Sequence, residues 1–144
     1  MKVSNILSTK GANVITVRPD QTIREAVQVL VRYNIGAVVV MDEAGQLAGI
    51  ISERDIVRRA AQDENLFTQP VREIMTRNVV TALPQDDVMS VAHTMTERRF
   101  RHIPIISTGQ LLGIISIGDV LKIQRDMYRG EIDTLETQLM AGNQ

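Results

Sequence analysis

The chain has 144 residues, 44% of them hydrophobic and 23% charged, with a formal net charge of −1 at pH 7 and no cysteine. This size and balance are those of one ordinary globular domain, and the small net charge argues against nucleic acid or an anionic membrane surface as a partner. The lack of cysteine excludes disulfides and thiol catalysis, and with no long apolar run and no secretory signal we expect a cytoplasmic protein.

The first half of the chain predicts the order strand, helix, strand, strand, helix. Residues 14–17 form a short β-branched run that ends before Pro19. Thr22 is placed as the N-cap of a helix, with Glu25 completing a capping box. The apolar face of that helix repeats at helical spacing and consists of Ile23, Ala26, Val27 and Leu30.

The remaining elements of this half follow in order. The continuous apolar run 36–41 suits a strand that is buried on both sides. Residues 43–45 form a hairpin turn into a paired strand over 46–52, and a second helix begins near Glu53. Residues 62–70 then form a linker to the second half.

The second half predicts the same order of elements. A strand over 79–82 precedes a helix capped by Asp87. Strands over 102–106 and 110–116 come next, and the last helix begins near Ile117. The apolar face of the helix capped by Asp87 consists of Val88, Val91, Ala92 and Met95.

The two halves are copies of one unit. The sequence Gly-Ile-Ile-Ser at 49–52, with an aspartate at 55, returns 64 residues later at 113–116, with an aspartate at 119. A short helical lead-in at 71–75 is mirrored at 3–7. We therefore expect an α/β (α+β) fold of two tandem β-α-β-β-α units related by a pseudo-twofold axis, with an extended C-terminal helix. The expected segments are 1–65, 66–125 and 126–144.

The C-terminal segment departs from its counterpart in the first unit. From Asp119 to about Met140 there is no proline, and Gly130 is the one glycine, so a single long helix is expected. Its apolar stripe is incomplete and consists of Ile123, Met127, Leu135 and Leu139. We expect this helix to pack on a partner subunit. The alternative is a frayed, solvated tail.

The repeated Ser-x-x-Asp places Ser52 with Asp55, and Ser116 with Asp119, at strand-to-helix junctions. One interpretation is a plain capping box. The other is a ligand site, because a helix N-terminus suits a phosphate and an aspartate there can bind the vicinal hydroxyls of a ribose. At the second junction Gly118 would let a ligand approach the backbone closely.

The segment 98–102 is the only dense basic cluster. Arg98 and Arg99 are interpreted as the solvated end of a helix, where cations complement the dipole. Arg101 and His102 fall at the start of a buried strand, so at least one of them should point into the cleft between the units, where an arginine could bind phosphate. His93 should lie on the surface, and the spacing of the two histidines predicts no metal site.

The Thr-x-x-Pro at the start of each unit, the Arg-His-Ile-Pro at 101–104 and the two Gly-Ile-Ile-Ser-x-x-Asp motifs resemble a tandem pair of cystathionine β-synthase (CBS) domains, also called a Bateman module. The resemblance covers residues 3–125 and is greatest to small stand-alone CBS pairs. It implies binding of AMP, ADP, ATP or NAD(H) in two clefts between the units, without a metal.

The resemblance also implies which residues form each cleft. The residues of one cleft would be Lys10, Ile15, Ile35 and Gly36 with Ser116, Gly118 and Asp119. The residues of the other would be Val80, Phe100 and Arg101 with Ser52, Arg54 and Asp55. Arg101 and His102 would lie near the axis that relates the units. Because Val39 stands where the family has proline, and Pro104 keeps it, we expect unequal affinities in the two clefts.

The function that these features imply is a nucleotide-sensing regulatory module that acts on an unidentified protein. The resemblance implies a homodimer, a flat disc of four CBS units that meet through the apolar helix faces. Catalysis is disfavoured because the candidate carboxylates lie at helix N-termini, which lower their pKa, and neither histidine is paired with a nucleophile. A structural adaptor without ligand is the remaining alternative, and nucleic-acid binding has little support in the net charge.

Overall fold

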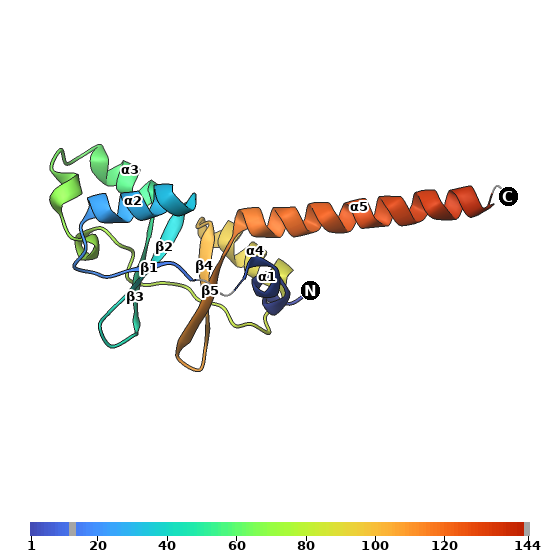
Figure 1. Cartoon of the computed structure of the whole chain (residues 1–144), viewed down its shortest axis with the longest axis horizontal. Coiled ribbons are helices and arrows are strands. Elements are labelled where there is room, and N and C mark those ends of the chain that lie inside the picture. The colour runs from blue at the N-terminus through green and yellow to red at the C-terminus, as the bar shows by residue number, and fades with distance from the viewer. Residues whose placement is uncertain (12–13, 143–144) are drawn as a thin grey trace.

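The computed structural model describes residues 1–11 and 14–142. Two small α+β units lie side by side, and one long helix projects away from them (Figure 1). The predicted fold class is therefore confirmed.

The first unit has the predicted order of elements. They are β1 (Thr16–Val17), α2 (Ile23–Tyr33), β2 (Ala37–Met41), β3 (Leu47–Ser52) and α3 (Glu53–Ala60). The sheet order is β1-β2-β3, with β1 parallel and β3 antiparallel to β2. Because β2 is the central strand, four of its five residues are buried, as its unbroken apolar sequence predicts.

The second unit repeats the helix and the hairpin. Its elements are α4 (Val88–Arg98), β4 (His102–Ser107), β5 (Gln110–Ser116) and α5 (Ile117–Gly142). β4 and β5 pair antiparallel. The ladder of each hairpin is interrupted at the same place in the repeat, between Val40 and Met41 and between Ile105 and Ile106.

The predicted strand over 79–82 is wrong in extent. Only Ala82 pairs, in a single parallel bridge with Ile105, through hydrogen bonds from Ala82 N to Pro104 O and from Ile106 N to Ala82 O (both 3.0 Å). A longer ladder would next need a bond from the N–H of residue 104 to the carbonyl of Val80. Pro104 has no N–H, so the strand ends there.

The predicted helix caps are confirmed with one exception. Thr22 accepts a hydrogen bond from Glu25 N, and Asp87 accepts one from Ser90 N. The predicted capping box at Thr22 is only half formed, because the Glu25 carboxylate instead accepts a hydrogen bond from Gln21 Nε2 at 2.9 Å. The side-chain amide of Gln21 has therefore taken the place of the Thr22 backbone N–H as the donor.

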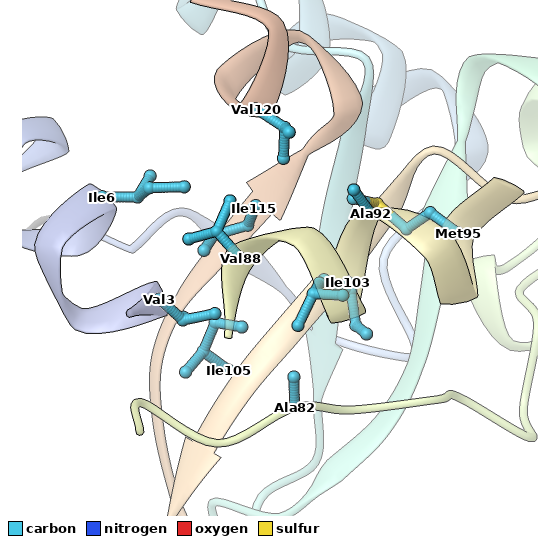
Figure 2. Packing of buried hydrophobic residues seen from close by; sticks show 11 residues of the cluster. Val3, Ile6, Ala82, Val88, Ala92, Met95, Ile103, Ile105, Ile115 and Val120 are labelled. Atoms are coloured by element: carbon cyan, nitrogen blue, oxygen red, sulfur yellow. The ribbon is translucent and has the colours of Figure 1, made fainter. Parts of the chain in front are cut away.

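Each unit is completed by a segment that comes from outside it. Helix α1 (Val3–Lys10) packs on the second unit, where Val3 and Ile6 join a core that includes Ile105 and Ile115 (Figure 2). The segment after α3 completes the core of the first unit. It contains two short 3-10 helices, η1 (Leu66–Thr68) and η2 (Val71–Glu73), and it contributes Leu66, Val71 and Met75 to that core. The lead-in predicted at 71–75 is thus a 3-10 turn, and its counterpart α1 is a longer helix.

The apolar helix faces lie inside the units. Ile23, Ala26 and Leu30 belong to the first core, and the matching residues of α4 belong to the second. These faces are therefore not available to a partner, which corrects the expectation that dimerisation uses them. The sequence pattern shows that a helix has an apolar face, but the short strands of the same unit are what cover it.

Two glycines at equivalent positions mark where the exchanged segments approach the hairpins. A Cβ on Gly49 would lie 2.7 Å from the carbonyl oxygen of Thr76, which is fixed because Thr76 and Ile50 exchange two backbone hydrogen bonds. A Cβ on Gly113 would lie 2.6 Å from Leu7 Cδ2. The first obstacle is backbone, whereas the second is the end of a side chain that can rotate.

We expect Gly49→Ala to lower the free energy of unfolding by about 1–3 kcal/mol, the range for overpacking a tight contact. Gly113→Ala is the matched control and should cost less, because Leu7 can adopt another rotamer. Urea denaturation of both variants measures the difference. An equal loss, or a larger one for Gly113→Ala, would contradict this account of the packing.

Candidate functional site

Both Ser-x-x-Asp motifs form the capping geometry that their sequence predicts. At the start of α3, Ser52 Oγ accepts from Asp55 N at 3.2 Å, while Asp55 Oδ2 accepts from Ser52 N and Ser52 Oγ, each at 3.0 Å. At the start of α5, Ser116 Oγ accepts from Asp119 N at 3.1 Å, and Asp119 Oδ2 accepts from Ser116 N at 2.8 Å. In the described part of the chain neither Oδ1 accepts a hydrogen bond. Each aspartate therefore caps its helix and keeps one oxygen for another partner.

The two aspartates differ in their electrostatic partner. Lys10 Nζ donates to Asp119 Oδ2 at 2.8 Å and to the carbonyl of Ile114 at 2.8 Å. Burial by itself would raise the pKa of Asp119, but the hydrogen bonds from Lys10 and Ser116 outweigh it and the pKa is lowered. Within residues 1–11 and 14–142, no cationic side chain forms an ion pair with Asp55. Asp119 is thus ion-paired inside the protein, whereas Asp55 has no ion pair in the described part of the chain.

A cleft of about 290 Å³ lies between the two units and contains Asp55. Its walls come from β2, β3 and α3 of the first unit, and from the segment 76–80 and the start of β4 of the second. The lining residues are Gly36, Ala37, Ile50, Ser52, Glu53, Arg54, Asp55, Arg58, Thr76, Asn78, Val79, Val80, Arg99, Phe100, Arg101 and His102. The cleft combines an apolar wall of valine, isoleucine and phenylalanine side chains with a charged one.

Positive charge dominates this cleft. Four arginines line it against two carboxylates, those of Glu53 and Asp55. Arg54 and Arg58 lie one helical turn apart on α3, and Arg99 and Arg101 lie between α4 and β4. Guanidinium groups bind phosphate through paired hydrogen bonds, so this wall is suited to an anionic ligand.

Arg99 is exposed at the end of α4, as expected for this part of the basic cluster, and it also lines the cleft. The chain leaves α4 at Arg99 with φ +60°, a left-handed C-cap conformation that turns the backbone out of the helical path. Arg98, still on the helix, is exposed as expected.

His102 lies between the two aspartate sites. It lines the cleft beside Gly36, where a Cβ would meet its ring at 3.3 Å. Burial lowers the pKa of His102, and Lys10 and Arg101 lower it further, while Asp119 and Glu53 act in the opposite direction. The charged groups that act on this imidazole therefore belong to both sites, Lys10 and Asp119 to one and Glu53 and Arg101 to the other.

The residues predicted for the two clefts fall into two groups. Those predicted with Asp55 (Ser52, Arg54, Val80, Phe100 and Arg101) all line the cleft with it. In the other set, Lys10 bonds to Asp119, and a Cβ on Gly118 would lie 3.5 Å from Ser116 Oγ. Three further members of that set lie elsewhere: Ile15 lines a hollow beside α2, Ile35 lines the groove between α2 and α3, and Gly36 lines the Asp55 cleft.

Sequence reasoning missed several residues of the cleft. Arg58 had a signal, because it stands four residues after Arg54 on one helix face. Thr76 and Asn78 had none, because they reach the cleft only through the pairing of Thr76 with Ile50 of β3.

Two further observations limit the chemistry. Across residues 1–11 and 14–142, no three His, Asp or Glu side chains come together as a metal-binding group. Within the same residues, no helix is both long enough and apolar enough to cross a bilayer.

Comparison with known proteins gives consistent matches. Residues 3–62 and 71–126 each match the CBS domain family. The crystal structure of a CBS-domain containing protein from Agrobacterium tumefaciens is 44% identical with a TM-score of 0.82, over 85% of this chain and 92% of that one. The mitochondrial CBS domain-containing protein CBSX3 of Arabidopsis thaliana is 32% identical over 97% of this chain and 72% of its own length.

A third relative was crystallised with ligands. The CBS domain pair of the protein MJ0100, in complex with 5′-methylthioadenosine and S-adenosyl-L-methionine, is 30% identical with a TM-score of 0.79. The match covers 88% of this chain and 98% of that chain. Both ligands contain adenosine.

The lowered pKa of His102 predicts a pH dependence of stability. The unfolded chain takes up a proton near the ordinary value of 6.5, whereas the folded chain holds His102 neutral to lower pH. The free energy of unfolding should therefore fall as the pH drops below about 6.5, and His102→Gln should flatten this slope. Urea titrations between pH 7.5 and 5 measure the slope, with His93→Gln, on the exposed side of α4, as the matched control. A slope that His102→Gln leaves unchanged would contradict the assignment.

Proposed function

This chain belongs to the CBS-domain family, and we propose that its tandem pair is a regulatory module that binds an adenine nucleotide in the cleft of Asp55. The observation that carries the proposal is one cleft of about 290 Å³ between the units, which holds four arginines and a carboxylate, that of Asp55, without an ion pair in the described chain. The free Oδ1 of Asp55 is placed to accept a hydrogen bond from a ribose hydroxyl, and the apolar wall suits an adenine ring.

The arginines favour a nucleotide over a nucleoside. The ligands of MJ0100 carry no phosphate, and an uncharged adenosine would leave Arg54, Arg58, Arg99 and Arg101 without an anionic partner. A ligand with phosphates would pair with them through charge-assisted hydrogen bonds. AMP, ADP, ATP or NAD(H) is therefore the proposed ligand class, and those with two or more phosphates should bind most tightly.

The Asp119 site should be the weaker of the two. A ligand that uses this carboxylate meets a charge that Lys10 already compensates at 2.8 Å. A ligand phosphate that draws Lys10 away breaks its bonds to both Asp119 and the Ile114 carbonyl. In both cases, binding at Asp119 competes with existing bonds of Lys10, whereas binding in the Asp55 cleft breaks no ion pair of Asp55. We therefore expect one dominant nucleotide site per chain.

A ligand-free structural adaptor is the second candidate. The observation in its favour is that both aspartates form capping boxes, which by themselves explain why the sequence has Asp at these positions. Catalysis is not part of the proposal, because the hydroxyl that contacts a carboxylate in this cleft, that of Ser52, is engaged with Asp55 in the capping box of α3. The proposed setting is the cytoplasm, and the protein that would respond to the nucleotide is unidentified.

We also propose that the module is a homodimer that forms a disc of four CBS units. The faces are not those first expected, but a groove between α2 and α3 whose edges are Val31 and Val57, 75% and 68% exposed. The second unit offers Leu121 at the position equivalent to Val57, and it is 59% exposed. Burying these apolar surfaces against a second copy would stabilise the dimer.

The nucleotide proposal is tested by Asp55→Asn. Asparagine also caps helices, so the stability should change little. The ligand should lose a hydrogen bond to a charged group, which weakens binding by about 1.5–3 kcal/mol. Isothermal titration with AMP, ADP, ATP, NAD⁺ and NADH measures this, and the matched variant Asp119→Asn should have a smaller effect. Flat titrations with every nucleotide at millimolar concentration would leave the adaptor as the better account. Wild-type affinity in both variants would show that the two aspartates are only helix caps and would refute the proposed ribose contact.

Arg101→Ala serves as the control for the phosphate contact in the same titrations. It should weaken the binding of ATP far more than that of adenosine. A uniform loss for both ligands would indicate damaged packing rather than a phosphate site.

The disc is tested by Val57→Glu. Light scattering at low micromolar concentration should give twice the chain mass of 16.1 kDa for the intact protein. Val57→Glu should give one chain mass, because a buried unpaired charge opposes association. Leu83→Glu, in an exposed loop before α4, is the matched control. An intact protein that is monomeric at these concentrations would refute the disc.

A further inference from the structure

The end of α5 has no partner within the described chain. Ile123 packs against the second core, and Gln124 Nε2 lies 3.3 Å from Met89 Sδ, but every residue from 125 to 142 is exposed. This free helix is about 27 Å long and projects from the body (Figure 1). It lies almost wholly beyond the CBS match, which ends at residue 126. Ile123, expected to contact a partner, is instead committed to its own unit.

A narrow apolar seam runs along the free helix. Tyr128, Ile132, Leu135 and Leu139 follow one another at spacings of four, three and four residues, and each is more than half exposed. This is the a/d spacing of a two-stranded coiled coil. Met127, which was expected to contribute, falls beside the seam. An isolated helix of this length is only marginally stable in water, and Gly130 weakens it further, so the seam is suited to pairing.

The charges of the free helix identify the partner. Toward the body it carries Arg125 and Arg129 beside a single acid, Asp126, whereas toward its tip it carries only acids. These acids are Glu131, Asp133 and Glu136. The helix is therefore complementary to a copy of itself that runs in the opposite direction, and it repels one that runs in the same direction.

We propose that residues 125–142 form an antiparallel coiled coil with the same residues of a second copy. In the register that brings the apolar seams of the two copies face to face, Tyr128 packs on the partner's Leu139, and Ile132 packs on the partner's Leu135. Arg125, the first free residue, then lies opposite the partner's Gly142, the last residue of α5, so the pairing spans the whole free helix.

Flanking charges fix the direction of this pairing. The register places Arg129 beside the partner's Glu136, and the twofold symmetry makes this ion pair twice. A parallel pair would instead place Glu131 beside the partner's Glu136 and each Arg125 against its own copy. The antiparallel arrangement therefore has two ion pairs where the parallel one has three like-charge contacts, Glu131 with Glu136 twice and Arg125 with Arg125 once.

This surface is separate from the proposed disc, and the inference does not depend on it. The centre of the coil lies about 14 Å beyond residue 124, so the two bodies stand at opposite ends of the paired helices. The groove at Val57 stays free for a different copy. If both contacts form, the coils link two discs, and the mass should rise from two chains to four with concentration.

The test reverses one charge. Glu136→Arg should weaken association through α5 at least tenfold, because it turns two ion pairs into two repulsions. Adding Arg129→Glu to it should restore association. Asp133→Arg, an equal charge change outside the seam, is the matched control. Sedimentation velocity from about 1 to 200 μM measures all four proteins, and the same series on a Val57→Glu background separates the coil from the disc.

Cross-linking tests the direction, because the chain has no native cysteine. A mixture of Arg125→Cys and Gly142→Cys proteins should form the mixed disulfide on oxidation. Arg125→Cys alone should not, since the two copies of residue 125 stand about 25 Å apart. The proposal would be overturned if Glu136→Arg associated as the wild type does, or more strongly. It would also be overturned if Arg125→Cys formed a disulfide-linked homodimer, or if deleting residues 125–144 left the assembly unchanged.

Discussion

The exchange of lead-in segments between the units is the constraint on which the rest of this structure depends. A hairpin with one short parallel strand or a single bridge cannot bury both its faces, so each unit needs apolar side chains from elsewhere. Val3 and Ile6 supply them to the second unit, and Leu66, Val71 and Met75 supply them to the first. Neither core is complete without a segment from outside its own helices and strands.

The same exchange builds both aspartate sites. Because α1 packs against β5, its last residue, Lys10, reaches Asp119. Because Thr76 pairs with Ile50, the residues that follow it are carried into the cleft of Asp55. The segment that completes a core thus also completes the site at the end of the same hairpin, which couples the geometry of the sites to the folding of the whole pair.

The two copies of the unit share the Ser-Asp capping box and differ in the charges around it. The positions that carry Arg54, Arg99 and Arg101 at one site carry Gly118, Asn34 and Gly36 in the other copy. The guanidinium groups therefore gather in the cleft of Asp55, while Asp119 is compensated by a lysine. Hydrogen bonds to a ligand are strongest where a charged side chain makes them. The two copies therefore differ at the positions that would most affect the affinity for a charged ligand.

By itself the sequence determined what depends on residues a few positions apart. The order of strands and helices, the hairpin turns and the Ser-x-x-Asp caps all follow from local spacing, because caps and turns are bonds within about four residues. The resemblance of its motifs to CBS domains added six residues that line one cleft together, namely Ser52, Arg54, Asp55, Val80, Phe100 and Arg101. Only the tertiary structure decided the rest. Lys10 and Asp119, which form an ion pair, are 109 residues apart. The strand predicted over 79–82 is reduced to a single bridge because Pro104, in the neighbouring strand, has no N–H to donate. Which apolar helix faces are covered, and which charges are compensated, are set by contacts between distant segments, and such contacts leave no periodic signal in the chain.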